Sequence, residues 1–168
     1  LGNIPQIPGV SISENNKTHN SIRINYSAGS GYDYVKFYVN GSDKGNFSSS
    51  PVNLTGLSPN TTYKIKARAH GNGGFGNESN ELTIKTYLTP STVSSDNIDN
   101  IEPFTCTAII NSSNTSNTSK YEFTLCDKNK NPIGSPIQTN NSYYNFTGLQ
   151  EETEYYIRYR VQSKDSGN

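Results

Sequence analysis

The residues of this chain that could carry out chemistry are few. Among 168 residues there are two histidines and two cysteines, the side chains most often used as general bases, nucleophiles and ligands of transition metals. His19 and His70 both fall in predicted loops, and no Gly-x-Ser-x-Gly motif marks a nucleophile elbow. We therefore expect no catalytic residue and no cofactor, and we expect that the chain is not an enzyme.

One polar stretch partly resembles a calcium loop. Asp127, Asn129 and Asn131 place oxygen ligands at alternate positions, as at the start of an EF-hand loop. The sixth position, however, is Pro132 rather than glycine, and the twelfth is Gln138 rather than a bidentate glutamate. We interpret the stretch as a turn and expect no metal site.

We predict no disulfide bond between the two cysteines. Cys106 shares an apolar face with Ile110, whereas the alternation of Phe123 and Leu125 turns Cys126 outward. A bond between the two would require their Cβ atoms to converge. We expect a buried thiol at Cys106 and a partly exposed one at Cys126.

Asn-x-Ser/Thr sequons are more frequent than the composition explains. Chance placement of 23 Asn and 38 Ser plus Thr in 168 residues gives about five sequons, whereas 12 occur. Three of them follow one another in residues 111–119, which we expect to be a loop that packs against no hydrophobic core. The sequons are candidate N-glycosylation sites, the alternative being that an Asn-rich composition alone produces them. The candidates are Asn16, Asn25, Asn40, Asn46, Asn53, Asn60, Asn77, Asn111, Asn114, Asn117, Asn140 and Asn145.

The net charge and the lengths of the apolar runs argue against two kinds of partner. The formal net charge is zero and the sequence pI is about 6.9, so no cationic field attracts phosphates and we expect no nucleic-acid partner. No apolar run approaches the roughly 20 residues that span a bilayer, so we expect no membrane insertion. The chain contains no Met, and we expect it to be a mature or excised piece.

The elements that must position these residues are predicted to be β-strands. Apolar residues alternate in short runs such as 21–26 and 34–39, and the second run ends at the turn pair Asn40-Gly41. The glycine-rich residues 71–76 join two such runs and open no helix, so they indicate a hairpin loop rather than a phosphate cradle. The weak acidic cluster at 96–100 is expected to be a linker or loop. The pattern is typical of an all-β fold.

The sequence also repeats itself. The segment Asn-Leu-Thr-Gly-Leu at 53–57 recurs as Asn-Phe-Thr-Gly-Leu at 145–149, and Tyr63 recurs as Tyr155. Both correspondences share one offset, since 145 − 53 = 155 − 63 = 92. A module of about seven short strands repeated at this distance predicts two tandem immunoglobulin-like β-sandwiches.

The residues around Tyr63 carry a family resemblance. Leu-Ser-Pro-Asn-Thr-Thr-Tyr at 57–63, followed by alternating apolar residues, resembles the second half of a fibronectin type III domain, particularly those of secreted bacterial enzymes and surface proteins. The resemblance implies that Tyr63 forms a structural tyrosine corner, which Tyr155 repeats. It departs from the family at Tyr26, where a core Trp is usual. We expect an N-terminal extension at 1–6, a first module at 7–87 and a second at 91–168.

The second module is predicted to be incomplete. In the first, 23 residues separate Tyr63 from Thr86 (86 − 63 = 23), whereas 13 follow Tyr155 (168 − 155 = 13), so the last strand is missing. A sandwich without it leaves a strand edge unpaired and an apolar groove open. Either the natural chain continues beyond Asn168, or another chain donates the strand. Residues 1–10 are a candidate donor, although a linker followed by a first strand is the simpler interpretation.

These features favour a structural or adhesive function outside the cell. The leading hypothesis is a glycosylated filament or surface-assembly subunit of a secreted or cell-surface protein. The alternatives are non-catalytic spacers of a secreted polysaccharide-active enzyme, or receptor-binding modules that use loops such as 71–76. The expected partners are protein, through self-assembly or a donor strand from a neighbouring chain, or a surface carbohydrate.

Overall fold

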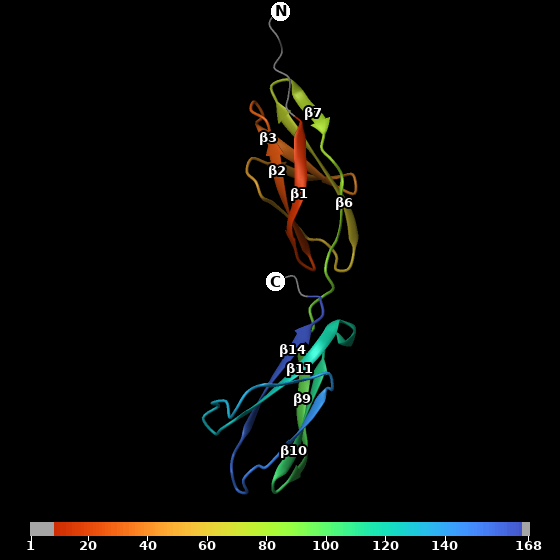
Figure 1. Ribbon diagram of the computed structural model, residues 1–168. Helices are drawn as coiled ribbons and strands as arrows, with labels where there is room; N and C mark the ends of the chain where they lie inside the picture. Colours follow the sequence, from red (N-terminus) through yellow and green to blue (C-terminus); the bar gives the residue numbers. More distant parts are fainter. Residues whose placement is uncertain (1–8, 166–168) are drawn as a thin grey trace, which may run out of the picture. The chain divides into compact units, whose positions relative to one another are not determined.

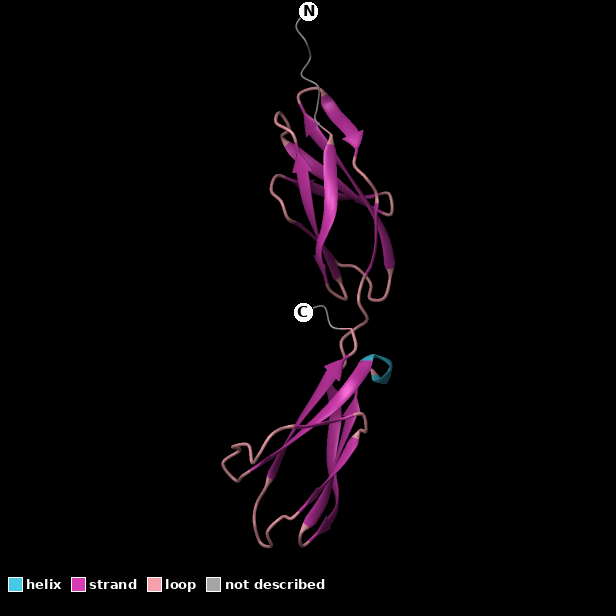
Figure 2. Ribbon diagram, in the orientation of Figure 1, coloured by secondary structure: helices cyan, strands magenta, loops and turns pink. Residues whose placement is uncertain are grey.

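A computed structural model describes residues 9–165 of the chain (Figure 1). Over these residues the chain folds into β-strands and a single turn of 3-10 helix, as Figure 2 shows. It divides into two compact units between Leu88 and Thr89, called here the first and second modules. None of the described residues forms a helix long and apolar enough to cross a membrane.

The first module is a sandwich of two antiparallel sheets. One sheet has the order β1-β2-β5, and the other has the order β4-β3-β6-β7, with β8 also paired to β6. The strands are β1 (Val10–Lys17), β2 (Ser21–Ala28), β3 (Tyr34–Val39), β4 (Ser42–Phe47), β5 (Val52–Thr55), β6 (Thr62–Gly71), β7 (Gly74–Glu78) and β8 (Leu82–Lys85).

Period-2 alternation builds the core of this module. Ile22 and Ile24 of β2 face Phe37 of β3 and Ile65 of β6, and all four side chains are buried. Because the side-chain period of a strand is two, the residues between them point to solvent and the register of each strand is fixed. The predicted strands at 21–26 and 34–39 are confirmed.

Tyr26 takes the place of the usual core Trp. Its side chain is buried, with its ring centroid 6.0 Å from Phe37 and 6.4 Å from Tyr32. Desolvation by burial raises the pKa of the Tyr26 phenol to about 12. An aromatic ring of similar reach therefore fills the centre of the sandwich.

The second module repeats this topology with fewer strands. One sheet has the order β13-β10-β9 and the other β12-β11-β14, around a core that includes Phe123 and Phe146. The elements are β9 (Val93–Glu102), β10 (Thr105–Ser112), η1 (Thr115–Asn117), β11 (Thr118–Cys126), β12 (Ile137–Thr139), β13 (Tyr143–Thr147) and β14 (Tyr156–Ser163). Residues 96–100, expected to be a loop or linker, lie inside β9. This strand is exposed along almost all of its length, so it shows no apolar alternation.

Candidate functional site

The main difference between the modules is the outer edge of β14. In the first module, β6 pairs with β3 on one edge and with β7 and β8 on the other. Its counterpart β14 pairs with β11 in the same register, since Phe123 lies opposite Tyr159 as Phe37 lies opposite Ala67, and 159 − 67 = 92. Within residues 9–165, β14 has no partner on its second edge. Its hydrogen-bonding groups on that side are free to pair with an added strand.

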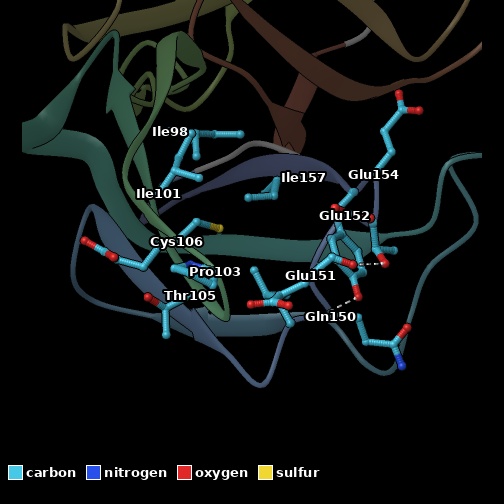
Figure 3. A pocket seen from close by; sticks show the side chains of 14 residues that line it. Ile98, Ile101, Pro103, Thr105, Cys106, Gln150, Glu151, Glu152, Glu154 and Ile157 are labelled. Atoms are coloured by element: carbon cyan, nitrogen blue, oxygen red, sulfur yellow. Dashed lines mark hydrogen bonds between the residues drawn. The ribbon is translucent and has the colours of Figure 1, made fainter.

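A groove lies beside this free edge. It has a volume of about 730 Å³, and β9, the start of β10 and the turn before β14 line it. Figure 3 shows Ile98, Ile101, Cys106 and Ile157 around the same hollow. Ile101 is 76% exposed, which is high for a large apolar side chain.

The groove lies at the position that β8 occupies in the first module. There, Ile84 of β8 lies opposite Tyr63 and is only 4% exposed. The equivalent of Tyr63 is Tyr155, which lines the groove. Ile65 is fully buried beneath β8, whereas its equivalent Ile157 is partly exposed. Within residues 9–165, no strand of the second module takes the place that β8 has in the first.

Burial on the opposite sheet shows the same difference. Ile22 pairs with Leu54 on β5, and Cys106 pairs with Phe146 on β13, which is the equivalent strand (146 − 54 = 92). Ile22 is fully buried, but Cys106 is only half-buried and lines the groove. Burial still raises the pKa of the Cys106 thiol. A strand in the groove would cover this thiol.

Two tyrosines hold equivalent turns in the two modules. Oη of Tyr63 accepts the backbone N–H of Ser58 at 2.8 Å, and Oη of Tyr155 accepts that of Gln150 at 3.2 Å. Both bonds span five residues, and they make the contact that the family resemblance implies for a tyrosine corner. In the second module this turn forms one end of the groove (Figure 3).

Charged side chains mark the outward face of the free edge. Arg158 and Arg160 are both exposed on β14, and an Arg158 guanidinium nitrogen donates to the carbonyl of Lys130 at 3.2 Å. At the end of the strand near the turn, Glu154 accepts a hydrogen bond from the Tyr156 hydroxyl at 2.8 Å. The edge is thus basic along the strand and acidic at its beginning.

Most of the sequon asparagines lie on the surface. Asn25 and Asn114 are partly buried, and Asn117 is buried. The exposed ones are Asn16, Asn40, Asn46, Asn53, Asn60, Asn77, Asn111, Asn140 and Asn145. Asn53 and Asn145 point outward from their strands, whereas Asn25 is less accessible and accepts a hydrogen bond from Asn15.

The expectation that residues 111–119 form a loop without buried side chains is wrong at Asn117. Its side chain is fully buried, with Nδ2 donating to the carbonyls of Thr89 at 2.8 Å and Asp165 at 3.3 Å. Its Oδ1 accepts the N–H of Asp165 at 3.0 Å. The neighbouring Asn114 also donates to the Thr89 carbonyl, at 2.9 Å. A glycan on Asn117 is incompatible with this packing, because the amide nitrogen that would carry the sugar is enclosed.

Two further expectations were wrong. His70 lies in β6 rather than in a loop, and it stacks on Tyr34 with ring centroids 4.6 Å apart. Cys126 is buried rather than partly exposed, because the turn that follows folds back and bridges it to Pro132, while Cys106 is the more exposed thiol. The two cysteines are not bonded to each other.

The stretch that partly resembles a calcium loop is a self-capped turn. Oδ1 of Asp127 accepts the backbone N–H groups of Asn129 and Asn131, both at 2.9 Å. The bond from Asn131 is the main reason that the pKa of the Asp127 carboxyl is lowered. Within residues 9–165, no group of three or more His, Cys, Asp or Glu side chains is arranged to hold a metal ion.

Comparison with known proteins gives a family match for the first part of the chain. Residues 4–85 match the model of the fibronectin type III domain family. No curated protein matches the chain. Among solved structures, a two-domain fibronectin type III segment of chicken tenascin is 14% identical, with a TM-score of 0.44 and coverage of 97% of this chain and 95% of that one.

Two other solved structures are also similar. The chicken CNTN1 FN1-FN3 domains are 16% identical, with a TM-score of 0.47 and coverage of 97% of this chain and 65% of that one. The Yersinia enterocolitica family 28 exopolygalacturonase is 17% identical over 51% of this chain, with a TM-score of 0.43, and the match spans 21% of the enzyme. The family model for the fibronectin type III domain thus covers the first module, and within residues 9–165 the second module repeats the strand order of the first with fewer strands.

Proposed function

We propose that the chain is an extracellular structural or adhesive segment whose second module is closed by a strand added to the free edge of β14. The observation that supports this most directly is the groove beside β14, at the position where β8 closes the first module. Exposed apolar side chains and unpaired strand groups at one place are the features that β-strand addition requires.

The surface of the chain supports an extracellular location. Fibronectin type III domains are typically extracellular or surface modules, and the exposed sequon asparagines of both modules are positioned to carry glycans. Such glycans would shield a surface that is rich in Asn, Ser and Thr.

The binding of a strand peptide to the edge of β14 tests the proposal. In a closed variant, a flexible Gly/Ser linker and a copy of residues 77–86 follow Asn168, so that the copied strand can fill the groove from within. We expect the unmodified chain to bind added strand peptides, as measured by sedimentation or fluorescence anisotropy, and the closed variant not to bind them. Equal behaviour of the two proteins would overturn the proposal.

The mass of the protein isolated from its natural source tests the remaining parts. A loss of mass on removal of N-glycans would support glycosylation in an extracellular compartment. An unchanged mass would show that the sequons are compositional, without affecting the addition of a strand at β14.

A further inference from the structure

The strands β5 and β13 form equivalent sheet edges in the two modules. β5 ends the order β1-β2-β5 and β13 ends the order β13-β10-β9. Within residues 9–165, neither strand has a partner on its outer side. An edge of this kind presents unpaired backbone N–H and C=O groups, to which a strand of another molecule can pair.

Neither strand carries the usual protection of a sheet edge. Such protection commonly comes from charged side chains, prolines or β-bulges on the edge strand. The sequences of β5, Val-Asn-Leu-Thr, and of β13, Tyr-Tyr-Asn-Phe-Thr, contain no charged residue and no proline. Both strands pair with their neighbours in an unbroken register, so neither contains a bulge. In β13, moreover, Tyr143 is 51% exposed, and aromatic residues favour strand pairing.

Other edge strands of the described chain are protected in these ways. β1 carries Glu14 and Lys17, and its register shifts between Glu14 and Asn16. β4 carries Asp43 and Lys44, and its pairing with β3 also contains a register shift. β9 carries three carboxylates and two register shifts. β12 is uncharged as well, but it is only three residues long, and a very short edge offers little to pair with.

A sequon asparagine at an outward position is what β5 and β13 share instead. Asn53 lies between the buried Val52 and Leu54, and Asn145 precedes the buried Phe146. Both asparagines are exposed, and they occupy equivalent positions, since 145 − 53 = 92. Within residues 9–165, the Nδ2 atom of neither side chain has a hydrogen-bond partner, whereas Oδ1 of Asn145 accepts from the hydroxyl of Thr107 at 2.9 Å. The atom that would carry a sugar is therefore available at both sites.

The outer face of the first sheet has room for a sugar beside Asn53. Arg23 on β2 lies opposite Asn53 on one side and opposite Asn16 on the other. These three residues and Lys17 are among those that line a hollow with a volume of about 350 Å³. Its polar and charged side chains can form hydrogen bonds with sugar hydroxyl groups. A glycan on Asn53 can therefore lie against the sheet at the edge that β5 forms.

We infer that N-linked glycans at Asn53 and Asn145 protect the outer edges of β5 and β13 against pairing with strands of other molecules. The inference rests on the glycosylation in the proposed function and gives a role to these two sites. In an antiparallel pair, the Cβ atoms of directly opposite residues are about 4.5–5.5 Å apart. A strand joined to either edge would thus place a side chain in the space that the sugar needs. The glycans act at these edges as charged side chains act on β1 and β4.

Sequon variants with and without the glycans provide the test. The chain is produced in a eukaryotic host that attaches N-glycans, and mass spectrometry of glycopeptides gives the occupancy of Asn53 and Asn145. Thr55→Ala combined with Thr147→Ala removes both sequons, whereas Thr55→Ser combined with Thr147→Ser retains them. We expect the alanine variant to associate, in sedimentation velocity, at concentrations about tenfold lower than the serine variant.

Hydrogen exchange shows where the association occurs. The outer amides of β5 and β13 should exchange slowly in the associated alanine variant and rapidly in the monomeric serine variant. Protection confined to β14 would place the association at a different edge and would overturn the role of the two glycans. Sequon variants are preferable to enzymatic release of the glycans, because a release that converts asparagine to aspartate puts a new charge on the edge.

A charge at the same two positions should replace the glycans. In protein made without N-glycans, Asn53→Lys combined with Asn145→Lys should raise the concentration needed for association by about tenfold. The matched control is Asn72→Lys combined with Asn129→Lys, which adds the same charge at one exposed turn in each module. The control should associate like the unmodified chain.

The possible outcomes separate this inference from the proposed function. If the sites are occupied and the alanine and serine variants associate equally, the protective role is wrong, while glycosylation and the extracellular location stand. Unmodified Asn53 and Asn145 in the protein from its natural source would overturn the inference together with its premise. Equal association of the lysine variant and its control would show that β5 and β13 are not the edges at risk, which would also overturn it.

Discussion

Replacement of Asn117 with alanine should destabilise the second module far more than the loss of a surface asparagine would. The side chain joins the start of the module, at the Thr89 carbonyl, to the segment after β14, at the backbone of Asp165. Alanine removes the Asn117 bonds to one N–H and two carbonyls in a place that is closed to water, although the Thr89 carbonyl keeps its bond from Asn114. A buried polar group that loses its partner pays its full desolvation cost.

The magnitude follows from the number of bonds. Three hydrogen bonds at about 1 kcal/mol each give a loss of about 3 kcal/mol in the free energy of unfolding, to which the small cavity adds little. For a module of this size, such a loss lowers the melting temperature by about 10–20 °C. Asn117→Asp should not restore stability, because a carboxylate cannot donate to the Thr89 carbonyl.

The cysteines make the assay specific to one module. Both lie in the second module, so the alkylation of Cys126 during a urea titration reports the unfolding of that module alone. Ser119→Ala is the matched control, because it removes the sequon at Asn117 and leaves the buried amide in place. The Ser119 hydroxyl donates to the exposed carbonyl of Gln162 at 3.0 Å, so its loss should cost under about 1 kcal/mol. Equal costs for Asn117→Ala and Ser119→Ala would refute the structural role of the amide.

Three further predictions concern residues that recur between or distinguish the modules. Tyr63→Phe and Tyr155→Phe should each destabilise their own module by about 1 kcal/mol in chemical denaturation, because each removes one hydrogen bond to a backbone N–H. In the native protein, Cys106 should be alkylated well before Cys126, as mass spectrometry of the labelled peptides would show, and simultaneous labelling would contradict the burial of Cys126. The lowered pKa of Asp127 means that its stabilising effect is present above about pH 4 and is lost as the pH falls through the folded-state pKa, so Asp127→Asn should flatten the acid limb of the stability profile.

The sequence predicts the first module better than the second because only the first buries a complete set of alternating faces. Ile22 and Phe37 belong to runs in which every second side chain enters the core, so pattern and burial coincide. In β9 almost every residue is exposed, so nothing in the pattern distinguishes residues 96–100 from a loop. Edge strands of this kind are defined by pairing, which a local pattern does not reveal.

The misassigned side chains have a common cause. Cys126 points away from the alternating apolar face, yet the turn at Pro132 covers it. Asn117 looks like one more residue of a polar repeat, yet it is enclosed between segments 28 and 48 residues away in the sequence. Both positions are buried by tertiary contacts rather than by their strand's own face. The Tyr155 corner, by contrast, depends on a contact only five residues away and could be predicted from the repeat.

The residues of β14 combine two roles at one edge. Ile157 and Val161 keep the inward alternation that a buried strand needs, although the strand has a neighbour on only one side within the described chain. An unpaired edge of this kind is open to pairing with other exposed strands, and charged side chains are the usual protection against such pairing. Arg158 and Arg160 are exposed on the outward face of β14, so an antiparallel pair of two β14 strands would set like charges opposite each other. The same strand therefore combines an inward face that packs in the core with an outward face that disfavours its pairing with a second copy of itself.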